Sequence, residues 1–195
     1  MAKRALIMTN QELLQAFRET GALLDGHFLL RSKLHSGQYF QCALLLQQMP
    51  LVERLGAALA AKFDAGTVDT VIAPAMGGLV IGQEMARQLR KRFIFVEKEE
   101  GKLVLRRGFK IAAGERILVV EDVITKGGRV QETLDIVRAH GGRVAGIAVV
   151  VDRSGGTVNF GVPMQSLGKL EVETFDPATC PLCKQGLPLV KPGSK

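Results

Sequence analysis

One segment near the middle of the chain constrains the fold more strongly than any other. Residues 117–129 read Ile-Leu-Val-Val-Glu-Asp-Val-Ile-Thr-Lys-Gly-Gly-Arg, an apolar run with two adjacent acids that leads into a turn of small and basic residues. Apolar residues at helical spacing follow from about Val130 to His140. In open parallel sheets, ligands bind at the carboxyl ends of the strands. The segment therefore predicts a buried strand, a ligand-binding turn and a helix.

The rest of the chain shows the same alternation of strand-like and helix-like segments. Continuous apolar strands separated by helices are typical of a parallel sheet covered on both faces, and right-handed crossovers make such a sheet Rossmann-like. A length of 195 residues fits one domain, residues 1–195. We expect strands at 70–75, 93–96, 117–120 and 144–151, and helices at 10–20, at 50–63, after Gly77-Gly78 through Leu89, and at about 130–140.

A charged segment from about Glu97 to Gly114 interrupts this alternation. It separates two apolar strands and carries both acids and bases. A short solvated hairpin would account for it, and so would a mobile lid, because long loops in compact domains are often functional. The residues alone leave both interpretations open.

The turn after the predicted strand 117–120 suits a phosphate group. A glycine-containing turn at a helix N-terminus offers free backbone N–H groups and a favourable dipole. Thr125 adds a hydroxyl, and Lys126 and Arg129 add positive charge. Glu121 and Asp122 would repel an anion unless they bind sugar hydroxyls or a metal. The chain has no P-loop motif and no G-x-G-x-x-G after a strand, which disfavours those nucleotide folds.

Net charge and hydropathy limit the possible partners. The formal net charge of +7 suits either nucleic acid or a polyanionic small molecule. The chain lacks an RNA-recognition type aromatic cluster and a long basic run, so we do not expect nucleic acid as its partner. No apolar run approaches the roughly 18–20 residues that span a bilayer. The N-terminus lacks a secretory apolar region, and we expect a cytoplasmic protein without membrane contact.

The cysteines form one short motif, Cys180-Pro-Leu-Cys183, and Cys42 lies far from it in sequence. Such a pair can be redox-active or half of a zinc site, but zinc normally takes four ligands. The nearest histidine in sequence, His140, does not have metal-finger spacing. The sequence therefore favours a local structural role for the pair.

The pattern in residues 117–129 resembles the 5-phosphoribosyl-1-diphosphate (PRPP) motif of type I phosphoribosyltransferases. In that family the two acids hold the ribose hydroxyls and the turn holds the 5-phosphate. The resemblance thus implies ribose binding by Glu121 and Asp122 and phosphate binding by the turn. The residues assigned to PRPP are Arg31, Lys98, Glu121, Asp122, Val123, Ile124, Thr125, Lys126, Gly127, Gly128 and Arg129.

Other segments resemble orotate phosphoribosyltransferases, and the similarity covers nearly the whole chain. Residues 21–40 are similar to their N-terminal hood, which we expect near 1–45, and residues 73–78 to their pyrophosphate loop, with Met76 and Gly77. Val151-Asp-Arg153 matches the position of an arginine that contacts orotate. The resemblance assigns orotate binding to Tyr39, Phe40, Thr125 and Arg153. Tyr39 and Phe40 would by default pack in the core, and the family uses backbone groups there.

The charged segment, 97–114, resembles the mobile loop of this family, whose lysine reaches the diphosphate across a dimer interface. Lys98 matches that lysine, so the catalytic residues implied are Lys98 and Asp122. The chain departs from the fuller loop at Glu97, where an Arg is expected, and has no loop histidine. Gly77 stands where some members have Lys, and Arg31 replaces a hood lysine.

Taken together, the resemblance implies transfer of phosphoribose from PRPP to orotate, giving orotidine 5′-monophosphate and pyrophosphate for pyrimidine biosynthesis. It implies Mg²⁺ held mainly by substrate rather than by a protein metal site, and a homodimer that shares the loop. Two alternatives remain at this point. One is a phosphoribosyltransferase for another base, and the other is a non-catalytic regulator that keeps the fold and binds nucleic acid.

Overall fold

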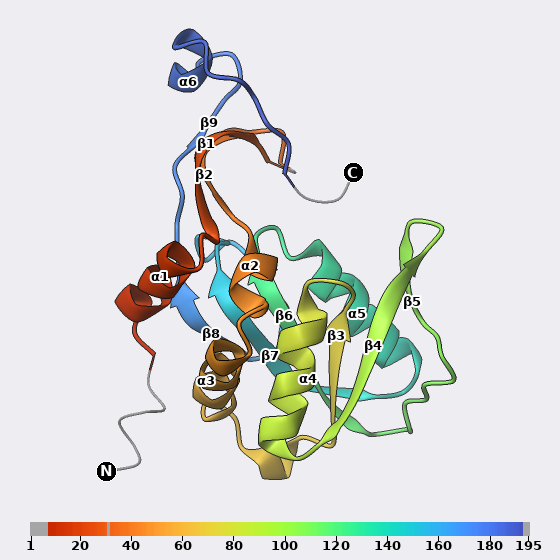
Figure 1. The fold of residues 1–195 in the computed structure, drawn as a ribbon. Helices are drawn as coiled ribbons and strands as arrows, with labels where there is room; N and C mark the ends of the chain where they lie inside the picture. The colour runs from red at the N-terminus through yellow and green to blue at the C-terminus, as the bar shows by residue number, and fades with distance from the viewer. Residues whose placement is uncertain (1–7, 31, 193–195) are drawn as a thin grey trace.

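The computed structural model describes residues 8–30 and 32–192. Its central sheet has six strands: β3 (Thr70–Pro74), β4 (Arg92–Glu99), β5 (Lys102–Leu105), β6 (Arg116–Ile124), β7 (Arg143–Asp152) and β8 (Met164–Lys169). Their order is β5-β4-β3-β6-β7-β8 (Figure 1). The strands from β4 to β8 in this order run parallel, and β5 pairs antiparallel with β4. The predicted parallel sheet is confirmed.

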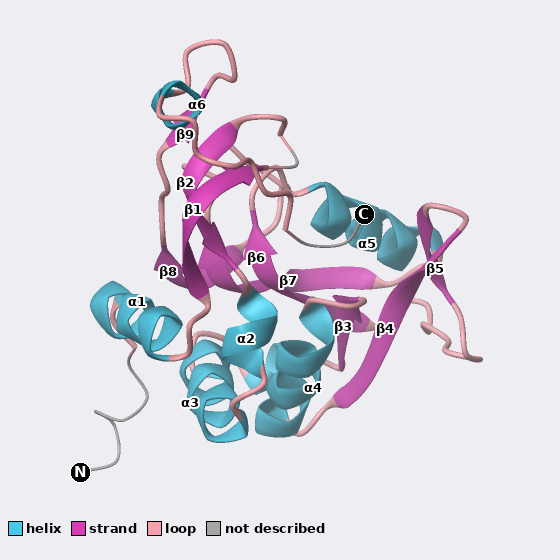
Figure 2. Ribbon diagram, turned by 45° about the horizontal axis from the view of Figure 1, so that its top comes forward, coloured by secondary structure: helices cyan, strands magenta, loops and turns pink. Residues whose placement is uncertain are grey.

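Helices cover both faces of the central sheet. One face carries α1 (Asn10–Glu19), α2 (Cys42–Leu46), α3 (Met49–Ala60) and α4 (Gly78–Leu89), and the other carries α5 (Gly128–Ala139) (Figure 2). A short 3-10 helix, η2 (Ala65–Thr67), precedes β3. Successive side chains of β6 explain this layering: Leu118 packs in the core beneath α1–α4, whereas Val119 packs in the core beneath α5. Strands buried on both faces are apolar throughout, as the sequence predicts.

Local signals set the ends of several helices. Thr9 caps α1: its hydroxyl accepts the Glu12 N–H at 3.2 Å, and the Glu12 carboxylate accepts the Thr9 N–H at 2.8 Å. This reciprocal capping box satisfies two donors that a helix N-terminus otherwise leaves free. Pro50 lies in the first turn of α3, where its missing N–H costs nothing. The predicted helices 10–20 and 50–63 thus match α1 and α3 to within three residues.

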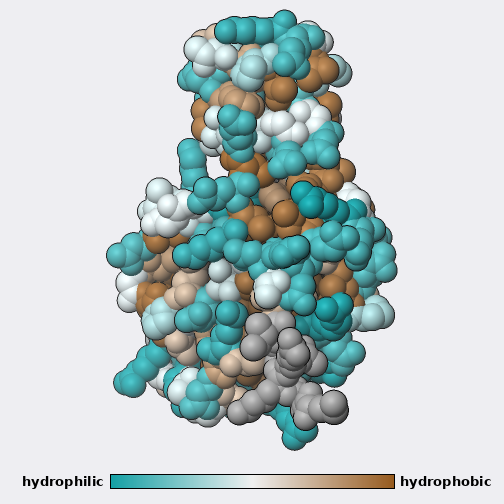
Figure 3. Space-filling model, turned by 90° about the vertical axis from the view of Figure 1, so that its left-hand side faces the viewer, coloured by the Kyte–Doolittle hydropathy of each residue, from teal (hydrophilic) through white to brown (hydrophobic). Residues whose placement is uncertain are grey.

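A second, smaller sheet stands above the central one (Figure 1), and this part of the molecule forms the upper lobe in Figure 3. It consists of β1 (Leu23–Leu29), β2 (His35–Phe40) and the two-residue strand β9 (Thr174–Phe175), with the short helix α6 (Pro181–Lys184) beside it. We call these four elements the hood. β1 and β2 fall within the predicted hood region, 1–45. Their C-terminal neighbours were not indicated by any sequence pattern, because β9 and α6 are too short to show periodicity.

Residues 97–105 form an ordered antiparallel hairpin from the end of β4 through β5. Lys98 lies opposite Leu103, and Glu99 lies opposite Lys102. The solvated hairpin, one of the two interpretations of the charged segment, therefore describes its first half. In the described residues, no helix is long and apolar enough to span a membrane.

Candidate active site

The two acids of residues 117–129 lie inside β6 and not after it. The strand was predicted to end at Val120, but it continues to Ile124, because Val123 and Ile124 still pair with Val151 and Asp152 of β7. Glu121 is buried, with 5% of its surface exposed, and Asp122 is half-buried. The carboxylates are therefore presented from a rigid strand near the carboxyl edge of the sheet.

Burial makes the charge on these two side chains costly. It raises the pKa of Glu121 well above its ordinary value, and the neighbouring Asp122 charge raises it further. Burial also raises the pKa of Asp122, although the Val123 N–H donates to its carboxylate at 2.7 Å. Neither acid has an ion-pair partner among the described residues. Such a pair is suited to a ligand that brings hydroxyl donors or a cation.

The turn after β6 leaves the N-terminus of α5 open. Gly127 precedes the helix with a φ of 74°, and the described structure shows no side-chain hydrogen bond capping it. Only glycine fits well there, because a Cβ on Gly127 would lie 2.6 Å from the Phe160 ring. Thr125 and Lys126 are exposed beside the backbone N–H groups of the first turn of α5. Uncapped N–H groups and the positive end of the helix dipole form a binding site for an anion such as phosphate.

The loop between β3 and α4 lies directly against the acid pair. A Cβ on Gly77 would stand 2.7 Å from the Asp122 carboxylate, and one on Gly78 would stand 3.3 Å from Glu121 Oε1. Arg129 from α5 donates to the Ala75 carbonyl at 3.3 Å. Met76 is 79% exposed, and its peptide bond with Ala75 is cis. The structure thus brings the predicted pyrophosphate loop, Met76 and Gly77, together with the residues of β6 and α5.

Arg153 follows β7 and lies over the ring of Phe40, with its guanidinium carbon 5.1 Å from the ring centroid. Its backbone N–H donates to the Ile124 carbonyl at 2.8 Å, which fixes it beside the end of β6. Its Nε is buried and has no hydrogen-bond partner among the described residues. Burial lowers the pKa of the guanidinium. A buried, unpaired donor on a cation indicates a place for an anionic or carbonyl-bearing ligand.

The two aromatic residues assigned to orotate differ in their surroundings. Phe40 is 5% exposed and meets Phe17 edge to face at 4.8 Å, so its side chain is part of the core. Tyr39 is half-buried and packs against Phe28, with 5.8 Å between ring centroids. The default expectation of core packing therefore describes Phe40, which also supports Arg153, whereas Tyr39 packs against Phe28 outside both core clusters.

Cys42 is a site residue that sequence reasoning missed. It begins α2, is 3% exposed, and its thiol lies near Asp122, Glu121 and Arg153. Burial raises its pKa well above the ordinary value, and the Asp122 charge adds to the effect. The thiol is therefore neutral and forms part of the wall beside the acids. An isolated cysteine between two predicted elements gives no signal of this position.

Lys98 lies on the exposed hairpin, and Arg106 and Arg107 follow directly after it. Arg107 forms two hydrogen bonds with Glu97 at 2.8 and 2.9 Å, and these bonds lower the pKa of that carboxyl. Arg106 pairs with Glu99 at 3.0 Å. Both arginines are thus engaged by hairpin acids, whereas Lys98 is exposed and forms no ion pair with a described residue. Arg31, assigned to PRPP, lies outside the described residues.

This arrangement of sheet, acid pair and open helix N-terminus is that of a phosphoribosyltransferase, and a family model described as "Phosphoribosyl transferase domain" matches residues 44–160. Curated relatives show which kind of phosphoribosyltransferase the chain resembles. Orotate phosphoribosyltransferases from Caldicellulosiruptor bescii and Pelotomaculum thermopropionicum are 51% and 52% identical to the chain over 188 residues, which is 96% of this chain and 99% of each relative. The chain belongs to the orotate phosphoribosyltransferase family.

Solved structures agree with this assignment. The crystal structure of orotate phosphoribosyltransferase from Aeropyrum pernix superposes with a TM-score of 0.69 at 27% identity, and the match covers 81% of this chain and 93% of that one. An orotate phosphoribosyltransferase from Mycobacterium tuberculosis, at 23% identity and a TM-score of 0.63, shares the fold.

Proposed function

We propose that this chain transfers the 5-phosphoribosyl group from PRPP to orotate, giving orotidine 5′-monophosphate and pyrophosphate in pyrimidine biosynthesis. The observation that carries the proposal is the buried acid pair of β6 beside the uncapped N-terminus of α5. Membership of the orotate phosphoribosyltransferase family supports it. We further propose that residues 1–195 act as one domain in the cytoplasm.

PRPP would bind across the ends of β6 and β3. In this proposal Glu121 and Asp122 accept hydrogen bonds from the ribose hydroxyls, which offsets the cost of shielding their charges from water. The backbone N–H groups from Thr125 to Arg129 hold the 5-phosphate. Glycine at position 77 leaves the Asp122 carboxylate uncovered, because any side chain there would meet it. The loop that contains Met76 and Gly77 would hold the diphosphate.

Orotate would bind between this site and the hood. Arg153 is the charged group for it, since its buried Nε lacks a partner among the described residues and its planar fork suits a carboxylate. Stacking on Phe40 holds the guanidinium in place. Thr125 and the backbone of Tyr39 would also contact orotate.

Mg²⁺ fits this site as an ion held mainly by substrate. Glu121 and Asp122 are hard oxygen donors, but among the described residues no third His, Cys, Asp or Glu joins them to make a protein cage. Mg²⁺ dehydrates reluctantly and usually bridges substrate phosphates with few protein ligands. When bound, the ion neutralises charge on the diphosphate as it leaves.

The chain itself would act by positioning and electrostatics. Departure of the diphosphate leaves positive charge on the ribose ring, and the orotate nitrogen then attacks with inversion and releases its proton to solvent. Asp122 holds the ribose hydroxyls through this change, and the α5 N-terminus fixes the 5-phosphate. Lys98 on the hairpin would stabilise the leaving diphosphate from a second chain of a homodimer. Closure of residues 97–114 would exclude water, which otherwise hydrolyses the donor.

A magnesium-dependent assay of orotate consumption on addition of PRPP tests this function. We expect turnover with orotate and little with adenine or guanine. Faster turnover with a purine would assign another base. Salt-dependent RNA or DNA binding without any turnover would favour the non-catalytic regulator instead.

A further inference from the structure

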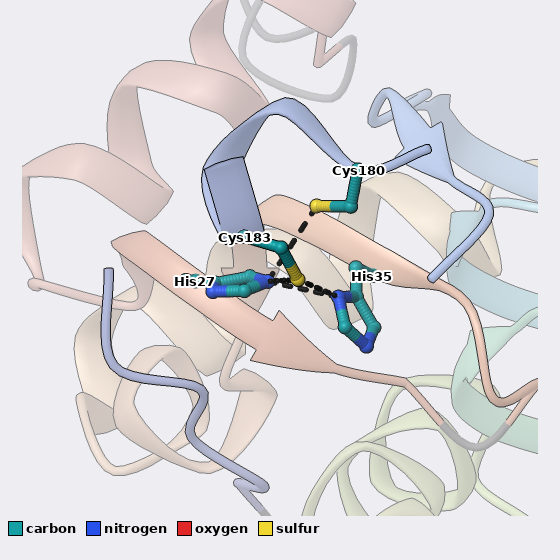
Figure 4. A group of neighbouring side chains, drawn as sticks. All are labelled: His27, His35, Cys180 and Cys183. Atoms are coloured by element: carbon teal, nitrogen blue, oxygen red, sulfur yellow. Dashed lines mark hydrogen bonds between the residues drawn. The ribbon is translucent and has the colours of Figure 1, made fainter. Parts of the chain in front are cut away.

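Four metal-ligating side chains converge in the hood (Figure 4). His27 comes from β1, His35 from β2, Cys180 precedes α6, and Cys183 lies within it. Both histidines and Cys180 are buried, and Cys183 is exposed. The ligand atoms of all four residues lie within 4.8 Å of one another. Two segments about 150 residues apart in sequence thus point these side chains at one place.

Three distances in this cluster match those between ligands around one ion, and all the ligand atoms lie within 4.8 Å of one another. Cys180 Sγ and Cys183 Sγ lie 3.6 and 3.7 Å from His27 Nε2, and Cys183 Sγ lies 3.3 Å from His35 Nδ1. Around a tetrahedral Zn²⁺ with ordinary bond lengths, ligand atoms lie roughly 3.3 to 3.8 Å apart. The two ring nitrogens are closer, at 2.9 Å, and would separate slightly on binding an ion.

A hydrogen bond behind the cluster orients His27 as a ligand. Its Nδ1 lies 2.9 Å from the Leu187 carbonyl oxygen, which can only accept, so Nδ1 carries the proton. The lone pair is therefore on Nε2, the atom that faces the two sulfurs. Histidine ligands of metals usually donate their other ring N–H to a carbonyl or carboxylate in this way.

Most of the hood also lies outside the hydrophobic core of the molecule. No described residue from 24 to 39 or from 173 to 192 belongs to either hydrophobic core cluster. Leu187, Leu189 and Val190 of its C-terminal segment are 42%, 45% and 50% exposed. That segment nevertheless pairs with β1. The Leu29 N–H donates to the Val190 carbonyl, and the Val190 N–H donates to the His27 carbonyl. Small units without a sufficient core commonly depend on a metal or a disulfide.

We propose that His27, His35, Cys180 and Cys183 bind a structural Zn²⁺ that fastens the C-terminal segment to the β1–β2 hairpin. A set of two thiolates and two imidazoles is typical of zinc, and four protein ligands leave no open position for a substrate. Binding deprotonates the two thiols and releases both protons to solvent, so the site gains two negative charges to match the ion. This site is independent of the proposed transferase reaction.

Metal content of the purified full-length chain tests the proposal. After reconstitution with Zn²⁺ under reducing conditions and desalting, we expect about one zinc per chain by mass spectrometry of the metal. The Cys180→Ser/Cys183→Ser double variant and His35→Ala should each fall to background. Cys42→Ser and His140→Ala remove the remaining cysteine and the remaining histidine, and both should keep the full zinc content.

Cobalt substitution and amide exchange separate this site from surface binding. Co²⁺ in the zinc-free protein should give the charge-transfer and intense visible bands of a tetrahedral thiolate site, and these should be absent in the double variant. Zinc removal should speed hydrogen exchange of the Leu29 and Val190 amides while leaving β6 protected. Absence of stoichiometric zinc in the wild type, equal zinc in the double variant, or a Cys180–Cys183 disulfide in the metal-reconstituted protein would each overturn the proposal.

Discussion

At the scale of single residues, the acid pair of β6 sets the strongest constraint. Two adjacent carboxylates in this position are kept at a cost, because burial raises the pKa of both, and the Asp122 charge raises the pKa of Glu121 further. A purely structural role would be served better by an uncharged side chain. The pair therefore indicates a binding site for a ligand that brings hydroxyl donors or a cation to the two carboxylates.

Asp122→Asn should reduce turnover with PRPP and orotate by roughly a hundredfold or more, as removal of a preorganised polar contact does in other enzymes. The fold should persist, because the amide keeps the volume and removes one buried charge. Steady-state kinetics and circular dichroism measure the two effects. Asp135→Asn, on the exposed side of α5, is the control for the same chemical change. Near-normal turnover in the Asp122 variant would refute its ribose role.

The pH dependence of stability should report Glu121. Its folded pKa is raised above the ordinary 4.5, so the folded state keeps a proton that the unfolded chain releases. Stability of the ligand-free protein should therefore fall as pH rises from the ordinary value through the raised one. Glu121→Gln has no carboxyl to titrate and should not lose stability in this way. The melting temperature of the variant minus that of the wild type should therefore increase across that pH range. Melting temperatures of Glu121→Gln and wild type that change in parallel with pH would contradict the raised pKa. Glu171→Gln, at an exposed position, is the control for the loss of one charge.

Arg153→Lys should raise the KM for orotate by roughly tenfold or more while changing the KM for PRPP much less. Lysine keeps the charge but loses the planar fork and the stacking on Phe40. Arg143→Lys, at the exposed opposite end of β7, is the matched control. Equal changes in both KM values would show that Arg153 acts on the whole site and not on orotate.

Single residues also show where sequence reasoning reached its limit. Glu121 and Asp122 were found because the strand, the acids and the turn are consecutive in the chain. His27 and His35 were not connected with Cys180 and Cys183, because their proximity is created only by pairing of the hood strands. The histidine nearest to the cysteine pair in sequence, His140, lies outside the cluster.

At the scale of elements, apolar patterns located the buried strands well and their ends less well. β6 continues past its acids because backbone pairing with β7 does not depend on side-chain polarity. β4 extends to Glu99 for the same reason, through its pairing with β5. Strand ends are therefore set by neighbours that lie far away in the sequence, and hydropathy does not record them.

The N-terminus of α5 gives a prediction at this scale. Gly127→Ala should raise the KM for PRPP, because the new Cβ strikes Phe160 and displaces the phosphate-binding turn. Gly141→Ala is matched to it at the other end of the same helix, since Gly141 has a φ of 80° and room for a Cβ. Both variants should lose roughly 1–2 kcal/mol of stability from the left-handed backbone. Kinetics and urea unfolding should show a KM change in Gly127→Ala alone.

At the scale of the whole molecule, the parallel sheet explains why dispersed segments meet. β3, β6 and β7 run in the same direction, so Gly77, Asp122 and Arg153 all emerge at one edge. The fold was predictable because this rule needs only strands and helices in alternation. The proposed exchange of the hairpin with a second chain rests on the family resemblance instead, because no pattern in the sequence of one chain specifies the interface.

The proposed shared loop can be tested by mixing two inactive chains. Lys98→Ala should remove the diphosphate contact and Asp122→Asn the ribose contact, and each homodimer then lacks a complete site. In a symmetric dimer with an exchanged hairpin, a mixed dimer combines the intact Lys98 of one chain with the intact Asp122 of the other. Random reassortment should therefore restore about a quarter of wild-type activity, since half the dimers hold one complete site of two. Native mass spectrometry verifies the exchange.

Mixed dimers without recovered activity would show that Lys98 serves its own chain, and a monomeric wild type would exclude the shared loop altogether.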